Sequence, residues 1–370
     1  MKVGVDGSIF VSSLTGIGNY AYHLLRQAAV TAPRIQFEVL THAPLCVEFP
    51  EQNIAVRFAS ARLSHNVYYW KLFGLAGAAR RAEVDVFWAA SGVAPFFMPC
   101  PVVLTVYDFV YKVSPGTMPL RARWFRRFSQ PWWIHRACAV FTIAAAVDDE
   151  MQRFCNREAA AVVRPAADAS FFRRSADEVS QIRREHGLGE RYNLIVGTLE
   201  PRKNLSLFVT QYLAFQRDYP HMTLPPLALT GGKGWKDDAI VRVLEEGERM
   251  GRVVRLGYVP VAHLPALYSG AELFFMPSRY EGFGMPILEA RKCGCPVVCS
   301  DVPAMREAGG EQALYHPPTA EGIRWALEEL YLHGRLPISD AGRGVTWSWQ
   351  SGAANLVRLL QDTAASLSRG

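Results

Sequence analysis

The stretch LFFMPSRYEGFGMPILEARKCGCPVVCS, residues 273–300, holds an apolar run, a glycine-rich turn, a helical pattern and a second apolar run. Pro286 suits the first turn of a helix, where no backbone N–H donor is needed. Gly294 is placed to end that helix, because glycine adopts the left-handed backbone of a helix C-terminus without strain. A short buried strand, a helix and another buried strand in this order are typical of a parallel sheet covered by helices.

The same alternation extends along the rest of the chain. In the second half, strands are predicted at residues 193–199, at the runs LALTG, VVRLG and LFFMPS, and at residues 296–300, with helices from Leu205, Asp237 and Leu264. In the first half, a strand is predicted in MKVGVDGSIF, then a loop, SSLTGIGNY, a helix from about Tyr20, and strands at 37–40, 55–58, 84–89, 102–106 and 139–143. The pattern pauses in a connection at residues 162–172.

This order predicts the α/β class, with two doubly wound Rossmann-like domains facing a central cleft. The predicted domains are residues 1–166 and 167–346, and the tail 347–370 reads as one long amphipathic helix. Ligands of such sheets bind beyond the carboxyl ends of the strands. The loops at those ends are therefore where a functional site is expected.

Composition supports this reading and excludes other classes. The 370 residues, 50% of them hydrophobic and 20% charged, allow two domains with their own cores. No low-complexity run or short repeat indicates a solenoid or a long disordered tail. Lys2 and Asp6 interrupt the first apolar run, so no signal peptide is expected. The seven cysteines lack metal-ligand spacing and are interpreted as reduced thiols of a cytoplasmic protein.

Two segments raise the question of a membrane. Residues 86–107 carry no charge, but Pro95, Pro99 and Pro101 argue against a continuous helix, so two strands joined by a proline-rich loop are expected. The segment from Arg121 to Arg136, RARWFRRFSQPWWIHR, mixes arginines with tryptophans. That mixture suits an anionic membrane surface and would make the protein peripheral at the inner face of the plasma membrane. The alternative is a solvated helix whose tryptophans pack inward. No nucleic-acid partner is expected.

Adjacent cations stand in the loop GTLEPRKN, between the strand that ends near Leu199 and the helix from Leu205. Arg202 and Lys203 would lie at a helix N-terminus, with Asn204 as its N-cap. The helix dipole does not stabilise positive charge there, so an anion is expected to neutralise them. A diphosphate fits the planar fork of arginine and the mobile charge of lysine. The alternative is a pair of solvated surface charges.

Two glutamates flank the glycine-rich turn of the opening stretch. Glu281 precedes it, and Glu289 is expected in the first helical turn after it. Gly282 and Gly284 let the backbone approach a ligand closely, and the amides of Gly284 and Met285 would point out of the helix N-terminus. Carboxylates accept paired hydrogen bonds from diols, so the pattern indicates a nucleoside diphosphate sugar, with a diol on either side of the diphosphate. Otherwise Glu289 is an ordinary charge near a helix start and Glu281 an ordinary loop residue.

The segment PSRYEGFGMPILEARKCGCPVV closely resembles the glutamate–seven residues–glutamate motif of retaining glycosyltransferase family 4, which has the GT-B fold. The runs TGIGNYAYHLL, GTLEPRKN, LTGGKGW, LGYVP and LPALYSGAELFFMPS resemble that family in the same order. The resemblance covers most of the chain and is most specific over residues 193–315. As a whole, the sequence resembles bacterial mannosyltransferases of surface polysaccharide synthesis that use GDP-mannose.

The resemblance implies a donor site. The residues expected to bind the donor are Gly16, Gly18, Arg202, Lys203, Tyr258, Val259, Glu281, Phe283, Gly284, Met285 and Glu289. Arg202 and Lys203 would hold the diphosphate, and Glu289 the ribose. Glu281, with backbone amides of the turn, would hold the transferred sugar, so that Glu281, Arg202 and Lys203 are the expected catalytic residues. Gly16 and Gly18 would close over the phosphates, and the backbone at Tyr258 and Val259 would meet the base.

The first domain departs from the family pattern in the loop TVYDF. Such enzymes often carry a histidine before the aspartate there, and this chain has Tyr107 before Asp108. Both are therefore candidates for the acceptor site. The resemblance further implies transfer with retention at the anomeric carbon, with the departing phosphate taking the acceptor proton. No metal or other cofactor is expected, because the chain has no aspartate–any–aspartate triplet and the cations would neutralise the diphosphate.

Several alternatives stay open at this point. The donor is expected to be GDP-mannose, with UDP-hexoses and GDP-deoxyhexoses as alternatives, and the acceptor a glycan or lipid-linked glycan. A GT-B epimerase, an inverting transferase and a catalytically silent partner subunit share the same fold. A dinucleotide-binding oxidoreductase would need G-x-G-x-x-G directly after a strand, and TGIGNY follows a loop.

Overall fold

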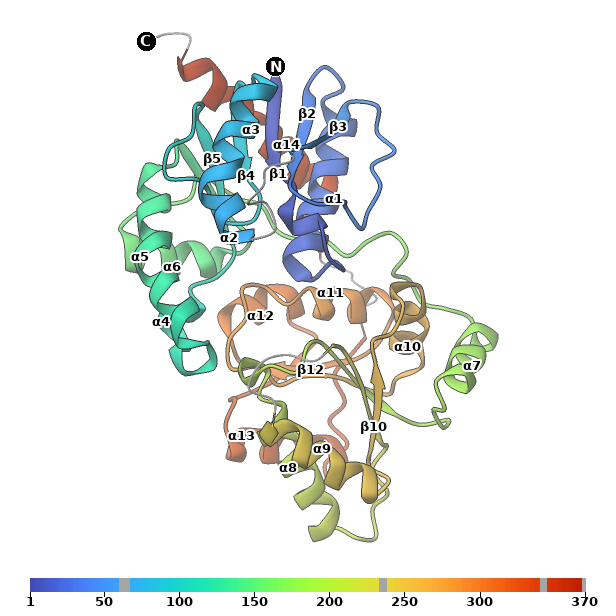
Figure 1. The fold of residues 1–370 in the computed structure, drawn as a ribbon. Helices are drawn as coiled ribbons and strands as arrows, with labels where there is room; N and C mark the ends of the chain where they lie inside the picture. Colours follow the sequence, from blue (N-terminus) through green and yellow to red (C-terminus); the bar gives the residue numbers. More distant parts are fainter. Residues whose placement is uncertain (60–66, 233–237, 340–344, 368–370) are drawn as a thin grey trace. The chain divides into compact units, whose positions relative to one another are not determined.

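The computed structural model describes residues 1–59, 67–232, 238–339 and 345–367. The chain divides into two compact units. Unit 1 consists of Met1–Lys112, Pro119–Ala166 and Trp347–Gly370, and unit 2 of Val113–Met118 and Ala167–Thr346. Each unit contains one parallel sheet, so the predicted α/β class with two Rossmann-like domains is confirmed (Figure 1).

The sheet of unit 1 has seven parallel strands in the order β3-β2-β1-β4-β5-β6-β7. Their bounds are β1 Lys2–Asp6, β2 Gln36–Thr41, β3 Ile54–Phe58, β4 Val86–Ala89, β5 Val102–Val106, β6 Ala139–Thr142 and β7 Ala161–Val162. Strand β1 lies between β2 and β4, with Val3 in register with Phe37 on one side and Val86 on the other. These central strands are buried, which explains why they read as near-continuous apolar runs.

Helices of unit 1 cover this sheet. Their bounds are α1 Gly16–Thr31, α2 Val67–Tyr69, α3 Leu75–Ala82, α4 Val110–Val113, α5 Leu120–Arg136, α6 Ala145–Cys155 and α14 Trp349–Leu367, and a π-helical turn, Trp70–Gly74, joins α2 to α3. Helix α14 comes from the C-terminal end of the chain and lies beside α1 (Figure 1). The ring of Trp349 packs on Tyr20 and stacks on His23, at centroid distances of 5.7 and 5.3 Å.

The sheet of unit 2 has six parallel strands in the order β10-β9-β8-β11-β12-β13. Their bounds are β8 Asn193–Val196, β9 Leu227–Thr230, β10 Val253–Gly257, β11 Phe274–Met276, β12 Val297–Ser300 and β13 Leu314–His316. The chain first adds strands on one side of β8 and then on the other, beginning with β11. The point between β8 and β11 is therefore the topological switch point, where open α/β sheets bind ligands.

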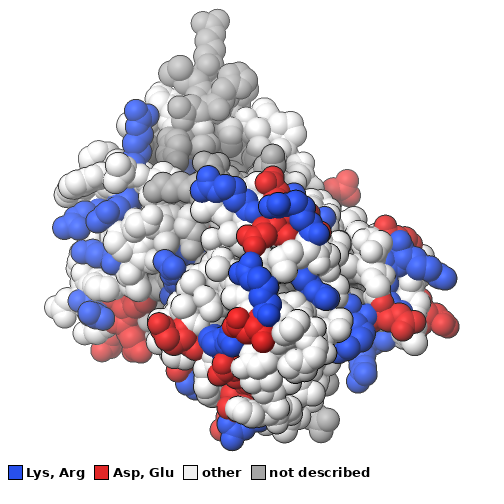
Figure 2. Space-filling model, turned by 90° about the horizontal axis from the view of Figure 1, so that it is seen from below, with Lys and Arg blue, Asp and Glu red and all other residues white. Residues whose placement is uncertain are grey.

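Helices lie on both faces of this second sheet. Their bounds are α7 Ala176–Glu185, α8 Leu205–Asp218, α9 Asp238–Arg249, α10 Leu264–Gly270, α11 Met285–Lys292, α12 Pro303–Gly309 and α13 Ala320–Tyr331. The core against α8, α9 and α13 includes the buried side chains of Phe208, Phe275 and Leu327. On the outer side of these helices, cross-helix ion pairs such as Arg217–Glu246 join basic to acidic residues. Figure 2 shows basic and acidic side chains intermixed on the face seen from this end.

Most predicted elements agree with the structure to within a few residues. Two short strands, β7 and β13, were not predicted, and the first helix begins at Gly16 rather than near Tyr20. All seven cysteines are free thiols. Within the described residues, no helix is both long and apolar enough to cross a membrane. The end of the LTGGKGW run, from Lys233, and the predicted helix start at Asp237 lie outside the described residues.

Candidate active site

The loop after β8 is shaped by a glycine with a positive φ. Gly197 has a φ of 144°, and a Cβ atom there would stand 3.2 Å from the Cε atom of Lys203. The side chain of Lys203 can therefore run back over the end of β8. A 3₁₀ turn, Pro201–Lys203, then leads into α8. This turn places Arg202 and Lys203 at the carboxyl end of a central strand.

The loop after β11 ends in a glycine-capped helix. Gly284 has a φ of 115°, which favours glycine, and it occupies the N-cap position of α11. Because β8 and β11 are adjacent, the loops that follow them lie side by side. The amide of Arg279 donates to the Arg202 carbonyl at 2.8 Å, and Arg279 Nε donates to Asn204 Oδ1 at 2.9 Å. The two loops are therefore fixed to each other by backbone and side-chain bonds.

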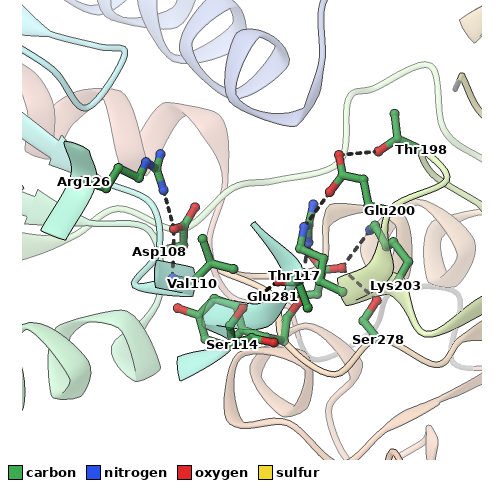
Figure 3. A network of polar contacts seen from close by, with 12 residues as sticks. Asp108, Val110, Ser114, Thr117, Arg126, Thr198, Glu200, Lys203, Ser278 and Glu281 are labelled. Carbon is green, nitrogen blue, oxygen red and sulfur yellow. Dashed lines mark hydrogen bonds and ion pairs between the residues drawn. The ribbon is translucent and has the colours of Figure 1, made fainter. Parts of the chain in front are cut away.

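Glu281 lies at the centre of a cluster of buried charges (Figure 3). Its Oε1 atom accepts hydrogen bonds from Lys203 Nζ and Ser278 Oγ, both at 2.8 Å. Its Oε2 atom pairs with Arg202 Nη1 at 2.5 Å. Arg202 also binds a second carboxylate, that of Glu200, through its Nε atom at 2.8 Å. Both oxygens of Glu281 are thus bound to groups of its own chain.

The charges in this cluster balance. Burial alone would raise the pKa of Glu281, but Arg202 and Lys203 lower it to about 2. Glu281 is therefore ionised at neutral pH, and with Glu200 it offsets the two cations. The anion expected beside Arg202 and Lys203 was a bound diphosphate; the structure already pairs them with Glu200 and Glu281, because Glu281 folds back between them, which the sequence does not show.

Glu289 is held differently from Glu281. It is the fifth residue of α11, so the expectation that it lies in the first helical turn was wrong by about one residue. Its Oε2 atom accepts a hydrogen bond from the hydroxyl of the buried Tyr268 at 2.9 Å. Burial raises the pKa of Glu289 to about 7, although Tyr268 and Lys203 act in the opposite direction. The two glutamates of the motif therefore differ in protonation near neutral pH.

Asn204 occupies the N-cap position of α8 but does not cap it. Its φ of 58° is left-handed, and its side chain makes no capping hydrogen bond. The side-chain amide instead accepts from Arg279 and donates to the carbonyl of Pro318 at 3.3 Å. The predicted capping role was wrong, because the side chain of Asn204 is hydrogen-bonded to Arg279 in the loop after β11 instead.

The other predicted donor residues of unit 2 surround these loops. Phe283 is buried, whereas Met285 is half-buried at the start of α11. Tyr258 follows β10 and is 69% exposed, and the neighbouring Val259 is buried. A small recess of about 10 Å³, room for roughly one water molecule, is lined by both Lys203 and Ser278. The switch point of the unit 2 sheet thus brings together the predicted catalytic residues, and their roles stay predictions.

The predicted residues of unit 1 have different surroundings. Gly16 and Gly18 lie in the first turn of α1, not in a loop, and only Gly18 is buried. The hydroxyl of the buried Tyr107 donates to the carbonyl of Ala90 at 2.5 Å, so this candidate acceptor residue turns its polar group into the protein. Asp108 is half-buried, and its Oδ1 atom pairs with Arg126 at 2.7 Å (Figure 3).

Sequence reasoning missed four residues of the site. Glu200 binds Arg202, and the hydroxyl of Thr198 donates to Glu200 at 2.9 Å. Ser278 and Tyr268 each donate to one of the two glutamates. Glu200 and Ser278 were visible as polar residues in the loops at strand ends, but Tyr268 lies in the apolar pattern of α10 and carries no such signal.

Comparison with known proteins identifies the family. The family described as glycosyl transferases group 1 matches residues 190–333. The O-antigen chain mannosyltransferase B of Escherichia coli is 31% identical over 326 residues, which cover 82% of this chain and 84% of that protein. This chain belongs to the group 1 glycosyltransferases. The family predicted from the glutamate motif is thereby confirmed.

Solved structures agree with the fold of this glycosyltransferase. WaaG, a glycosyltransferase involved in lipopolysaccharide biosynthesis, has a TM-score of 0.70 at 14% identity, with 97% of this chain and 99% of that chain covered. HepE of Anabaena, solved with UDP-glucose, has a TM-score of 0.67 at 19% identity, with 100% of this chain and 99% of that chain covered. The predicted GT-B fold is confirmed.

The acidic and thiol side chains of the glycosyltransferase do not gather into a metal site within the described residues. No group of three or more histidine, cysteine, aspartate or glutamate side chains is placed there to hold a metal ion. The charged cluster at the switch point instead pairs each carboxylate with a cation.

Proposed function

We propose that this glycosyltransferase transfers a hexose, with mannose from GDP-mannose as the expected donor, to a glycan or lipid-linked acceptor, with retention at the anomeric carbon. The observation that carries the proposal is the cluster of the half-buried Arg202 with the buried Lys203 and Glu281 at the switch point of the unit 2 sheet. The choice of mannose is supported by the name of the E. coli relative, an O-antigen chain mannosyltransferase. A role in cell-surface polysaccharide synthesis follows from the same relative.

In the proposed reaction, Arg202 and Lys203 bind the diphosphate and stabilise the negative charge that develops as the bond to the sugar breaks. This kind of electrostatic stabilisation is usually the largest single contribution to catalysis. The two side chains are held in place before the donor binds, because Glu200 and Glu281 orient the Arg202 fork from two directions. Such preorganisation avoids rearrangement during the reaction.

Glu281 is unsuited to act as a base or a nucleophile in this scheme. Both of its oxygens are bound, and a carboxylate with a pKa of about 2 is a weak proton acceptor at neutral pH. The departing phosphate is the better acceptor for the proton of the attacking hydroxyl. We therefore assign Glu281 to positioning: it holds the two cations, and because a carboxylate oxygen accepts more than one hydrogen bond, it can also bind sugar hydroxyls.

Metal independence is part of the proposal. Two cationic side chains already stand where the diphosphate is expected, so their N–H groups can bind its oxygens in the role that a divalent ion has elsewhere. We expect turnover to persist in EDTA. Loss of activity in EDTA that manganese restores would contradict this part of the proposal.

The donor is tested by thermal shift with GDP, UDP and the corresponding sugar nucleotides. A ligand at 100 times its Kd stabilises the protein by about 2.7 kcal/mol, which a melting curve detects. The expected result is stabilisation by GDP and GDP-mannose but not by UDP or UDP-glucose. Stabilisation by UDP-hexoses or by GDP-deoxyhexoses alone would show that the donor is one of these, and the proposed class of reaction would not change.

Retention is tested on the product. Nuclear magnetic resonance of the new linkage should show the same anomeric configuration as the donor. The opposite configuration would indicate an inverting transferase, and epimerised sugar nucleotide without transfer would indicate an epimerase. No turnover with any donor that binds would point to a silent partner subunit.

The proposed place of action is the cytoplasmic face of a membrane. Sugar nucleotides are made in the cytoplasm, and a lipid-linked acceptor lies in a bilayer. We propose that the segment from Arg121 to Arg136 provides the contact with that surface.

A further inference from the structure

Helix α5 presents an apolar stripe to solvent. Leu120, Trp124 and Phe128 are 68%, 57% and 67% exposed. Their four-residue spacing places them on one helix face, because an α-helix turns once in 3.6 residues. The rings of Trp124 and Phe128 stack, with centroids 5.8 Å apart. Single exposed apolar residues are normal on a protein surface, but three in a row on one helix indicate a surface that something covers.

Positive charge flanks this stripe on both sides. Helix α5 contains five arginines and no acidic residue. At 100° per residue, Arg127 falls on one side of the stripe and Arg121 on the other, and both are exposed. The outer face of unit 2, by contrast, mixes both signs of charge (Figure 2). The α5 face is therefore complementary to an anionic surface that accepts aromatic side chains.

The opposite face of α5 is fixed to the core of unit 1. Trp133 and Ile134 are buried. Arg126 Nη1 pairs with Asp108 Oδ1 at 2.7 Å (Figure 3). Gln130 Nε2 donates to the Asp108 carbonyl at 2.8 Å. Of the tryptophans in this segment, only Trp124 is more than half exposed. The structure thus restricts the candidate membrane contact to one face of α5. Arg126 lies outside that face and instead pairs with Asp108 within unit 1.

We propose that Leu120, Trp124 and Phe128 insert into the headgroup region of an anionic lipid bilayer while Arg121 and Arg127 bind its phosphates. Helices that lie in a membrane interface combine apolar side chains with flanking basic residues in this way. Because the other face of α5 holds the loop of Asp108, the same helix brings a candidate acceptor residue close to the lipid surface. The lipid contact refines the membrane contact of the proposed function, and this last step rests in addition on the proposed lipid-linked acceptor.

The test measures binding of the full chain to sedimented phosphatidylcholine vesicles with and without phosphatidylglycerol. Without donor or acceptor present, the result is independent of the proposed reaction. We expect binding to the anionic vesicles that weakens with salt. Each arginine near an anionic surface contributes about fivefold to binding. The double variant Arg121→Gln, Arg127→Gln should therefore lower the partition coefficient about 30-fold. Trp124→Ala with Phe128→Ala should lower it at least about tenfold.

Matched controls lie elsewhere on unit 1. Phe58→Ala removes an aromatic residue of 57% exposure, and Arg34→Gln with Arg358→Gln removes the same charge as the α5 pair. Both control variants should bind like the unaltered protein. Equal losses in the controls, or unchanged binding by the α5 variants, would overturn the proposal.

Direct insertion is read from Trp124 fluorescence. Bromine-labelled lipids should quench part of the tryptophan emission, and Trp124→Phe should remove that part while leaving binding intact. Equal melting temperatures of all variants show that they are folded. If the α5 variants instead abolish dimerisation of the protein in solution and vesicles play no part, the face is an interface between two copies, and the membrane proposal fails.

Discussion

At the scale of single residues, Lys203 is the side chain on which most of the site depends. Its Nζ atom pairs with Glu281, its stem runs past Gly197, and it is buried although it is charged. A lysine buried in this way is retained only where its charge is paired. Arg202 and Glu200 complete the cluster. The cations are therefore held in place by carboxylates of the protein before an anionic ligand binds.

Lys203→Ala should lower kcat at least about 100-fold, because removal of one group that stabilises developing charge costs about 2.7–4 kcal/mol. Steady-state kinetics measures this, and Lys292→Ala, an exposed lysine of α11, is the matched control. Near-normal turnover in Lys203→Ala would refute the role assigned to the cluster.

If Glu289 binds the ribose as proposed, donor binding should depend on pH. Its pKa of about 7 lies above the ordinary carboxyl value, so the folded protein holds this proton more tightly than the unfolded chain does. The contribution of this group to stability is therefore largest below about pH 4.5 and is lost as the pH rises to about 7. A ribose diol donates hydrogen bonds to the ionised carboxylate, so the affinity for the nucleotide should rise with pH through about 7.

Isothermal titration with GDP at several pH values measures this effect. Proton release should accompany binding below pH 7, and Glu289→Gln should remove both the release and the pH dependence of affinity. A pH-independent affinity in the unaltered protein would show that Glu289 does not change protonation on binding.

At the scale of elements, two loops of unit 2 cross so closely that only glycine fits. Gly231 follows β9 with a φ of 152°, and a Cβ atom there would stand 2.0 Å from the carbonyl oxygen of Gly197 in the loop after β8. The loop after β9 thus supports the loop that carries Arg202 and Lys203. The first glycine of the LTGGKGW run, Gly231, is explained by backbone packing in this place.

Gly231→Ala should lower the free energy of unfolding by about 2–4 kcal/mol, from steric overlap and a left-handed backbone. It should also weaken GDP binding, because the loop after β8 must shift. Gly232→Ala is the control, since a Cβ atom there meets nothing within 4 Å. Urea denaturation and titration with GDP measure the two effects, and equal stability of the two variants would contradict the argument.

At the scale of the whole molecule, the chain crosses between its two units and ends on the first. Helix α14 packs on α1, and its residues Ala353, Leu356 and Leu360 are completely buried. Trp347 Nε1 also donates to the carbonyl of Pro165 at 2.7 Å. The last helix is therefore part of the core of unit 1, although unit 2 precedes it in the sequence.

A chain that ends at Thr346 should lose the ordered structure of unit 1 and keep that of unit 2. Removal of α14 would expose the apolar side of α1, at about 1.5–3 kcal/mol for each large side chain uncovered. Calorimetry should show one of two unfolding transitions lost, with the remaining one still raised by GDP. An unchanged pair of transitions would show that α14 does not hold unit 1 together.

Much of this fold could be predicted from local patterns in the sequence. Central strands such as β4 and β11 are buried and so read as apolar runs, and the turn from Glu281 to Gly294 carries its own glycine and proline signals. Strands β7 and β13 have only two or three residues and carry no periodic signal. The start of α1 was missed because Gly16 and Gly18 read as loop residues.

The sequence by itself determined the α/β class, the family and the loops that carry Arg202, Lys203, Glu281 and Glu289, because these depend on local patterns of apolar residues, glycines and charges. Only the tertiary structure decided how the charges are paired. Glu281 reaches Arg202 and Lys203 across about 80 residues of chain because β8 and β11 are neighbours in the sheet. The buried surroundings then give the two glutamates different pKa values. Glu281 faces cations and stays ionised, whereas Glu289 faces the Tyr268 hydroxyl and holds its proton more tightly.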